Sequence, residues 1–142
     1  MIDEDPPPGI VLALHRATHA TLQALAVRLA GLDLPASEIN ILANLAGHDP
    51  LTVGALAAAT ATRPTTLTSV LDRLVRRGYV VREVDPADRR SFLVSLTPAG
   101  QRAAGTVSAA VRELEQGALS RVSPAQRAGF LAVIDALSEA QL

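Results

Sequence analysis

The sequence predicts a mainly helical fold that carries one small β-hairpin. Its 142 residues are 49% hydrophobic but only 2% aromatic, and the apolar residues are nearly all Ala, Leu and Val. That composition favours packed helices over a sheet-rich fold. Apolar residues follow the helical period at Leu67, Val70, Leu71 and Leu74, whereas residues 91–96 alternate with a period of two, as a strand does.

The elements before the hairpin follow from spacing and from the residues that start or stop helices. Residues 1–9 are acidic and contain three consecutive prolines, so we expect an extended or disordered arm. Two helical patterns follow, over residues 10–31 and about 36–46. Thr52 is expected to cap a short helix that ends near Ala59. A tight turn then leads into a basic helix.

This basic helix spans residues 63–77 and has predicted signals at both ends. Thr62 is expected to cap its N-terminus, and Pro64 suits the first turn, where no N–H is needed. Arg76 and Arg77 lie in the last turn, where the helix dipole favours cations. Gly78 is expected to end the helix in a left-handed conformation. A short helix, a turn and a basic helix together form a helix-turn-helix.

The hairpin follows directly and makes the motif the winged variety of helix-turn-helix. Val80 and Val84 are expected to face the same way on its first strand, opposite the alternating second strand. The Asp-Pro pair at 85–86 is typical of a turn, because proline presets φ and aspartate bonds its own backbone. Three charged side chains are therefore expected in solvent at the tip: Asp88, Arg89 and Arg90.

Two more helices are predicted after the hairpin. Thr97 is expected to cap the first, and Ser123 and Gln126 form a capping box for the second. The winged lobe, residues 36–97, is thus flanked by long apolar helices over residues 10–31 and 98–142, within a single domain of residues 10–142. Such helices most readily bury their remaining apolar faces against a second copy, so we expect a C₂ homodimer.

The charge distribution indicates a nucleic-acid partner. Residues 63–90 hold seven arginines and four acidic residues, a net charge of +3, whereas the whole chain carries −1. Hydroxyl side chains and arginines can bond to base edges and phosphates, and a narrow arginine-tipped hairpin can enter a minor groove. The predicted DNA-contacting residues are Arg63, Thr65, Thr66, Ser69, Arg73, Arg76, Asp88, Arg89 and Arg90. A surface ion pair between Asp88 and Arg90 contributes only ~0–1 kcal/mol, too little to explain so much charge at one tip.

Several classes of protein are not expected. The chain has no cysteine, which excludes disulfides, zinc–thiolate sites and thiol redox sensing. No secretory signal and no run of ~20 apolar residues is present, so a cytoplasmic, nucleoid-associated protein without a membrane partner is expected. There is no nucleophile–base pair, phosphate loop or informative carboxylate pair, so we expect neither an enzyme nor a cofactor.

The three histidines admit two interpretations. His15 and His19 are four residues apart and have the spacing of metal ligands on one helix face, but Arg16 stands where a His-Glu-x-x-His motif has glutamate. Structural or solvent-facing roles are favoured, and no metal is expected. The weaker alternative is that they line an effector cleft together with His48.

The hairpin and its surroundings resemble the MarR family of bacterial winged helix-turn-helix regulators. The matching residues are Asp-Pro-Ala-Asp-Arg-Arg at 85–90, Val-Ser-Leu-Thr at 94–97 and then Gly100. The resemblance implies that residues 63–77 form the recognition helix, that Arg90 contacts the minor groove or its backbone, and that Asp88 orients an arginine. It also implies a small organic effector held between the first helices and the DNA-binding lobe. The stretch 34–38, Leu-Pro-Ala-Ser-Glu, departs from the family because the hydroxyl that usually caps the second helix is missing.

Two functions are therefore compared. The first is a sequence-specific transcriptional regulator, a repressor, that binds a pseudo-palindromic operator in double-stranded DNA as a homodimer and is released by an effector. The alternative is a winged-helix module that binds another protein through the hairpin. The basic helix favours the first.

Overall fold

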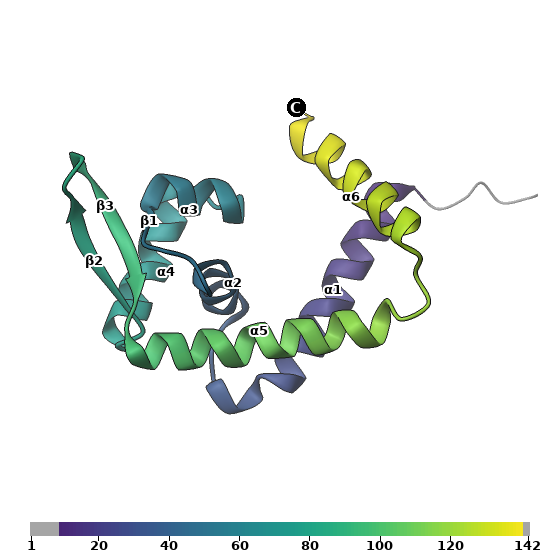
Figure 1. Ribbon diagram of the computed structural model, residues 1–142, viewed down its shortest axis with the longest axis horizontal. Helices are drawn as coiled ribbons and strands as arrows, with labels where there is room; N and C mark the ends of the chain where they lie inside the picture. The colour runs from purple at the N-terminus through teal and green to yellow at the C-terminus, as the bar shows by residue number, and fades with distance from the viewer. Residues whose placement is uncertain (1–8, 141–142) are drawn as a thin grey trace, which may run out of the picture. The chain divides into compact units, whose positions relative to one another are not determined.

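The structure is a computed structural model, which describes residues 9–140 (Figure 1). Residues 1–8 of the predicted N-terminal arm lie outside this range. The elements in chain order are α1 (Ile10–Arg28), a 3₁₀ helix η1 (Ala30–Leu32), α2 (Ala36–Leu45), β1 (Leu51–Thr52), α3 (Val53–Thr60), α4 (Pro64–Arg76), β2 (Val80–Asp85), β3 (Asp88–Leu96), α5 (Pro98–Ala118) and α6 (Pro124–Glu139). The expected mainly helical fold with a small wing is confirmed.

The chain divides into two compact units at the boundary between Val111 and Arg112, which falls within α5. The first unit holds the winged helix-turn-helix together with α1 and the first part of α5. The second holds the end of α5 and α6. The proposed domain limits, residues 36–97 for the lobe and 10–142 for the whole domain, stay predictions. None of the helices in the described residues 9–140 is long and apolar enough to cross a membrane.

The first unit has one hydrophobic core, centred on α2, α3 and α4. The three leucines and one valine whose spacing predicted α4 are all buried, so the opposite face of the helix is exposed to solvent. The strand bases and α5 close the core. Its fully buried large apolar side chains are Ile41, Leu42, Leu45, Leu56, Leu67, Leu71, Leu74, Val80, Val94 and Val107.

The sheet has three antiparallel strands in the order β1-β3-β2, one more than the predicted hairpin. Strand β1 pairs Leu51 with Val94 and Thr52 with Leu93. Two residues are too short to show a period, so the pattern there indicates only a loop and a helix cap. The predicted second strand was also too short: β3 begins at Asp88 and not at residue 91, so the three charged residues at the tip belong to the strand.

Most of the predicted helix ends are confirmed. The Thr52 side chain accepts a hydrogen bond from the backbone N–H of Ala55 at 3.0 Å, and Ser123 and Gln126 form the reciprocal capping box. The predicted Thr62 cap of α4 is wrong. Pro64 is the first helical residue, so Arg63 occupies the cap position, and the Thr62 hydroxyl donates to the Thr60 carbonyl at 3.2 Å instead.

The junction between α4, the wing and α5 is tightly bonded. Gly78 has φ +76°, as predicted, and ends α4 with hydrogen bonds from its own N–H to the Val75 carbonyl and from the Tyr79 N–H to the Leu74 carbonyl. Thr97 donates its hydroxyl to the Gly78 carbonyl at 2.6 Å and accepts from the Gly100 N–H at 3.0 Å. Thr97 therefore caps α5 and fixes the base of the wing to the end of α4.

Candidate nucleic-acid interface

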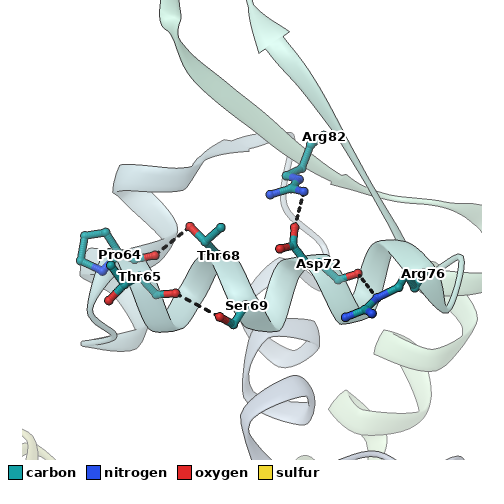
Figure 2. Close-up of polar contacts among 7 residues, drawn as sticks. All are labelled: Pro64, Thr65, Thr68, Ser69, Asp72, Arg76 and Arg82. Atoms are coloured by element: carbon teal, nitrogen blue, oxygen red, sulfur yellow. Dashed lines mark hydrogen bonds and ion pairs between the residues drawn. The ribbon is translucent and has the colours of Figure 1, made fainter.

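The outward face of α4 carries hydroxyl side chains. Thr65, Thr66, Thr68 and Ser69 are exposed, on the side of the helix away from the core. Thr68 donates its hydroxyl to the Pro64 carbonyl at 2.9 Å, and Ser69 donates to the Thr65 carbonyl at 3.4 Å (Figure 2). Because these hydroxyl protons turn back to the backbone, the oxygen lone pairs are left to accept hydrogen bonds from outside.

An ion pair joins this face of α4 to the wing. A terminal nitrogen of Arg82, on β2, contacts the Asp72 carboxylate (Figure 2). The Arg76 Nε–H donates to the Asp72 backbone carbonyl at 3.4 Å (Figure 2). The carboxylate that α4 presents to solvent is therefore neutralised by a residue of the hairpin, which reduces its repulsion of any anionic partner.

A second set of ion pairs joins α4 to α2. The Arg73 Nε lies 2.9 Å from the Glu38 Oε1, and the Arg77 Nε lies 3.5 Å from the Glu38 Oε2. The Glu38 side chain is fully buried, whereas the two arginine side chains are 42% and 41% exposed. Arg73 was predicted as a DNA contact, and it has an intramolecular partner as well.

The wing places its charges as the sequence predicted. Its tip is ordered by Asp85, whose carboxylate accepts from the Ala87 N–H at 2.9 Å, and by Asp88, which accepts from the Arg90 N–H at 3.1 Å. The Arg90 side chain is 95% exposed, and its Nε lies 3.5 Å from the Asp88 Oδ1. Arg89 is also exposed. The tip of the hairpin thus carries two exposed cations beyond the hydrophobic core, with one carboxylate beside them.

The apolar face of the wing is buried only at its base. Val80 and Val94 are buried, whereas Val84 and Phe92, which are directly opposite each other on β2 and β3, are 51% and 47% exposed. The predicted common face of Val80 and Val84 is therefore confirmed by the register, but it extends past the core into solvent.

The nine predicted contact residues lie on two neighbouring elements. Arg63, at the cap position, and the predicted residues of α4 form one group, and the three residues of β3 form the other. Whether they touch DNA stays a prediction. The predicted contact set did not include Glu38, Asp72, Arg77 or Arg82, and the pairings that these residues make between separate elements are not visible in the sequence. The glutamate at position 38 was noted only through its place at the start of a helix.

The histidines are not gathered into a site. His15, His19 and His48 are all exposed, the first two on α1 and the third in the loop after α2. Within residues 9–140, no three His, Asp or Glu side chains lie close enough together to hold a metal ion. None of the three lines the apolar cavity described next.

A cavity of about 120 Å³ lies between α1, α2 and the first part of α5. Its walls are apolar except for one side-chain amide, from Asn40. The residues that define it include Leu22, Leu25, Ile39, Asn40, Ala43 and Val111.

The fold and the charged surface define a winged helix-turn-helix protein, and comparisons with known proteins show which family it resembles. A model of the MarR family matches residues 32–91. A transcriptional regulator of the MarR family from Silicibacter pomeroyi is 29% identical, with a TM-score of 0.74 over 88% of this chain and 84% of that one. The chain is therefore similar to the MarR family, whose members are transcriptional regulators and not enzymes.

Two further relatives are informative. An uncharacterized HTH-type transcriptional regulator of Mycobacterium leprae is 36% identical over 86 residues, which are 61% of this chain and 58% of that protein. The structure of Bordetella bronchiseptica BpsR, whose DNA binding is regulated by 6-hydroxynicotinic acid, is 25% identical, with a TM-score of 0.77 over 94% of this chain and 95% of that one. The chain spans between 43% and 62% of the length of the curated relatives that it matches.

Proposed function

We propose that this protein is a sequence-specific DNA-binding transcriptional repressor of the cytoplasm. The observation that supports this most directly is the exposed arginine tip of the wing beside the hydroxyl-lined outer face of α4. A helix of this kind fits a major groove, and an arginine-tipped hairpin beside it fits the adjacent minor groove or its backbone. The MarR relationship makes DNA the natural partner for both.

The protein binds as a homodimer in this proposal. Several apolar residues of α1 are exposed in the first unit, among them Ile10 at 61% and Leu12 at 67%. In the second unit Phe130 and Leu131 are 58% and 59% exposed. A second copy would remove these side chains from water. Two recognition helices would then enter successive major grooves ~34 Å apart on a pseudo-palindrome.

Selection of bound duplexes from a random pool tests function and symmetry together. We expect a palindromic sequence whose half-sites are one helical turn apart, and light scattering on a sizing column should give a dimer. A pool without enrichment, at low as well as moderate salt, would refute the proposal. A monomer that still recovers a palindrome would refute only the dimer in solution.

Arg90→Ala tests the wing. Loss of a phosphate contact should reduce the slope of log affinity against log salt by about 0.9 per contact. Arg102→Ala, an exposed arginine of α5 outside α4 and the wing, is the matched control because it removes the same charge. Equal slopes for the parent and both variants would remove Arg90 from the interface.

A small aromatic effector fits the cavity between α1, α2 and α5. Its volume of about 120 Å³ suits one ring, since an apolar cavity of about 150 Å³ is known to bind benzene. The regulation of BpsR by a single-ring acid supports this size class. An effector that binds one arrangement of the dimer's two winged lobes more tightly than the other would favour that arrangement. DNA binding is weakened when the favoured arrangement is the one that does not fit DNA. Calorimetric titration with hydroxylated aromatic acids tests it, and an absence of heat and of any effect on DNA binding would refute it.

A second candidate is a module that binds a protein through the wing. The exposed pair of Val84 and Phe92 favours it, because an exposed apolar patch on a hairpin can pack against an apolar surface of a partner protein. Heparin retention separates the two candidates. If the protein is retained on heparin and retention falls steeply with salt, DNA binding is supported. If retention is weak, and Phe92→Ala abolishes binding to a partner protein, the protein-binding module is supported.

A further inference from the structure

Glu38 is the one charged residue in the core of the first unit, among the residues that the structure describes. It lies in the first turn of α2, where Pro35 occupies the cap position without a side-chain cap bond. A fully buried carboxylate is unfavourable unless cations meet it. Both of its oxygens face arginines of α4, although Oε2 makes no hydrogen bond of good geometry.

The way in which the arginines are held matters more than the charge. Arg73 and Arg77 are one helical turn apart, so they project from the same flank of α4. Each approaches Glu38 through Nε, at 2.9 and 3.5 Å. A guanidinium has five N–H donors, and pairing at Nε leaves the four at the two Nη atoms for another acceptor. Over residues 9–140 those Nη atoms have no further hydrogen-bond partner, and both side chains are about two-fifths exposed.

We propose that Glu38 is a positioning residue that holds Arg73 and Arg77 as a paired clamp for the DNA backbone, so that Arg77 also belongs to the interface. This inference rests on the proposed DNA-binding function. Phosphate is the ligand because of where the pair lies. Thr65, Ser69 and Arg76 occupy the line opposite the buried leucines, whereas Arg73 and Arg77 lie to one side of it. Side chains on the flank of a helix in the groove meet the sugar–phosphate wall, and contacts there set register.

A purely structural tie between α2 and α4 is the competing interpretation, and Glu38→Gln separates the two. The change keeps the shape of the side chain and removes one negative charge from the lobe. If Glu38 only ties α2 to α4, the arginines meet DNA as before and the loss of a negative charge makes DNA binding tighter. If Glu38 orients the clamp, binding becomes about tenfold weaker, because the single carbonyl oxygen of glutamine can meet only one of the two guanidinium groups and carries no charge.

Glu83→Gln is the matched control, since Glu83 is exposed on β2 and the change removes the same negative charge. Affinity is measured by fluorescence anisotropy on the duplex recovered from the random pool, over a series of salt concentrations. We expect Glu83→Gln to bind at least as tightly as the parent and Glu38→Gln to bind more weakly. A gain in affinity from both changes would overturn the proposal.

Arg77 variants keep the test decisive even if Glu38→Gln unfolds, because position 77 is exposed. Arg77→Ala should lower the salt slope by about 0.9 in each protomer and weaken specific and scrambled duplexes equally. Arg77→Lys should lose most of the same affinity, because one ammonium group cannot reach the buried carboxylate and a phosphate together. Parent-like binding by Arg77→Lys would contradict the positioning role. If the unaltered protein binds no duplex, both the proposed function and this inference are wrong. If the protein binds DNA but the Arg73→Ala and Arg77→Ala variants keep the parental salt slope, only the clamp is wrong.

Discussion

Gly100→Ala should separate the wing from α5, although the change adds only one methyl group. A Cβ at Gly100 would lie 1.8 Å from the Tyr79 carbonyl oxygen and 2.8 Å from its carbonyl carbon. Real Cβ atoms essentially never come within 3.0 Å of such an atom. The backbones of α5 and the Tyr79 segment would therefore have to move apart by about 1.2 Å, and neither contact atom belongs to a flexible side chain.

The cost follows from what that movement breaks. Forcing extra volume into a packed site costs typically about 1–3 kcal/mol. The Tyr79 carbonyl accepts a hydrogen bond from the Thr97 N–H at 3.0 Å, and the Thr97 hydroxyl is hydrogen-bonded to Gly78 and Gly100. About 1 kcal/mol is lost for each of these hydrogen bonds that stretches. We expect a total of about 2–5 kcal/mol. For a chain of this size that lowers the melting temperature by about 8–20 °C.

Gly105→Ala provides a control with the opposite sign. Gly105 lies in the same helix and is exposed, and no neighbouring segment comes within 4 Å of the place that a Cβ would take. Alanine in a helix interior is favoured over glycine by about 1 kcal/mol, so the melting temperature should rise by about 4 °C. Thermal unfolding followed by circular dichroism measures both variants. Two variants with the same melting temperature would refute the close approach of α5 to Tyr79.

Three further predictions test other parts of the chain. Thr97→Ala removes the hydroxyl that joins the Gly78 carbonyl to the Gly100 N–H, and denaturant unfolding should show a loss of about 1–2 kcal/mol. Ser123→Ala breaks the capping box of α6 and should cost about 1 kcal/mol there, with parental DNA affinity; a larger effect on DNA binding than on stability would contradict this. Ala43→Leu fills the cavity beside Asn40, so calorimetry should show effector binding lost while the operator is still bound.

Features that depend on neighbours in sequence could be predicted from the sequence. The period of the leucines indicated α4, and the alternation before Thr97 indicated the wing strand, because each pattern is local. The Ser123 capping box was predictable for the same reason. The Thr62 cap failed by one position: a threonine before Arg63-Pro64 has the right chemistry, but only the backbone path decides which residue precedes the first helical turn.

Features that depend on tertiary pairing could not be predicted in this way. Glu38 and Arg73 are 35 residues apart in the chain, and nothing in either segment indicates that they meet. Strand β1 is two residues long and exists only because β3 offers it a partner. The candidate contact residues were accessible to sequence reasoning because exposed cations and hydroxyls stand out on a helix. The residues that hold them in place were not.

The charge count of the lobe therefore describes the proposed interface poorly, and the donor atoms describe it better. Residues 63–90 carry a net charge of +3, but Glu38 lies among them in space and reduces that excess. Arg82 contacts Asp72 through a terminal nitrogen, whereas Arg73 and Arg77 meet the buried Glu38 carboxylate through Nε and keep their Nη ends. Pairing through Nε fixes the direction of a guanidinium without occupying the fork that recognises phosphate or guanine. On this argument carboxylates in a DNA-binding surface need not oppose binding, because those that contact Nε orient the cations that make it.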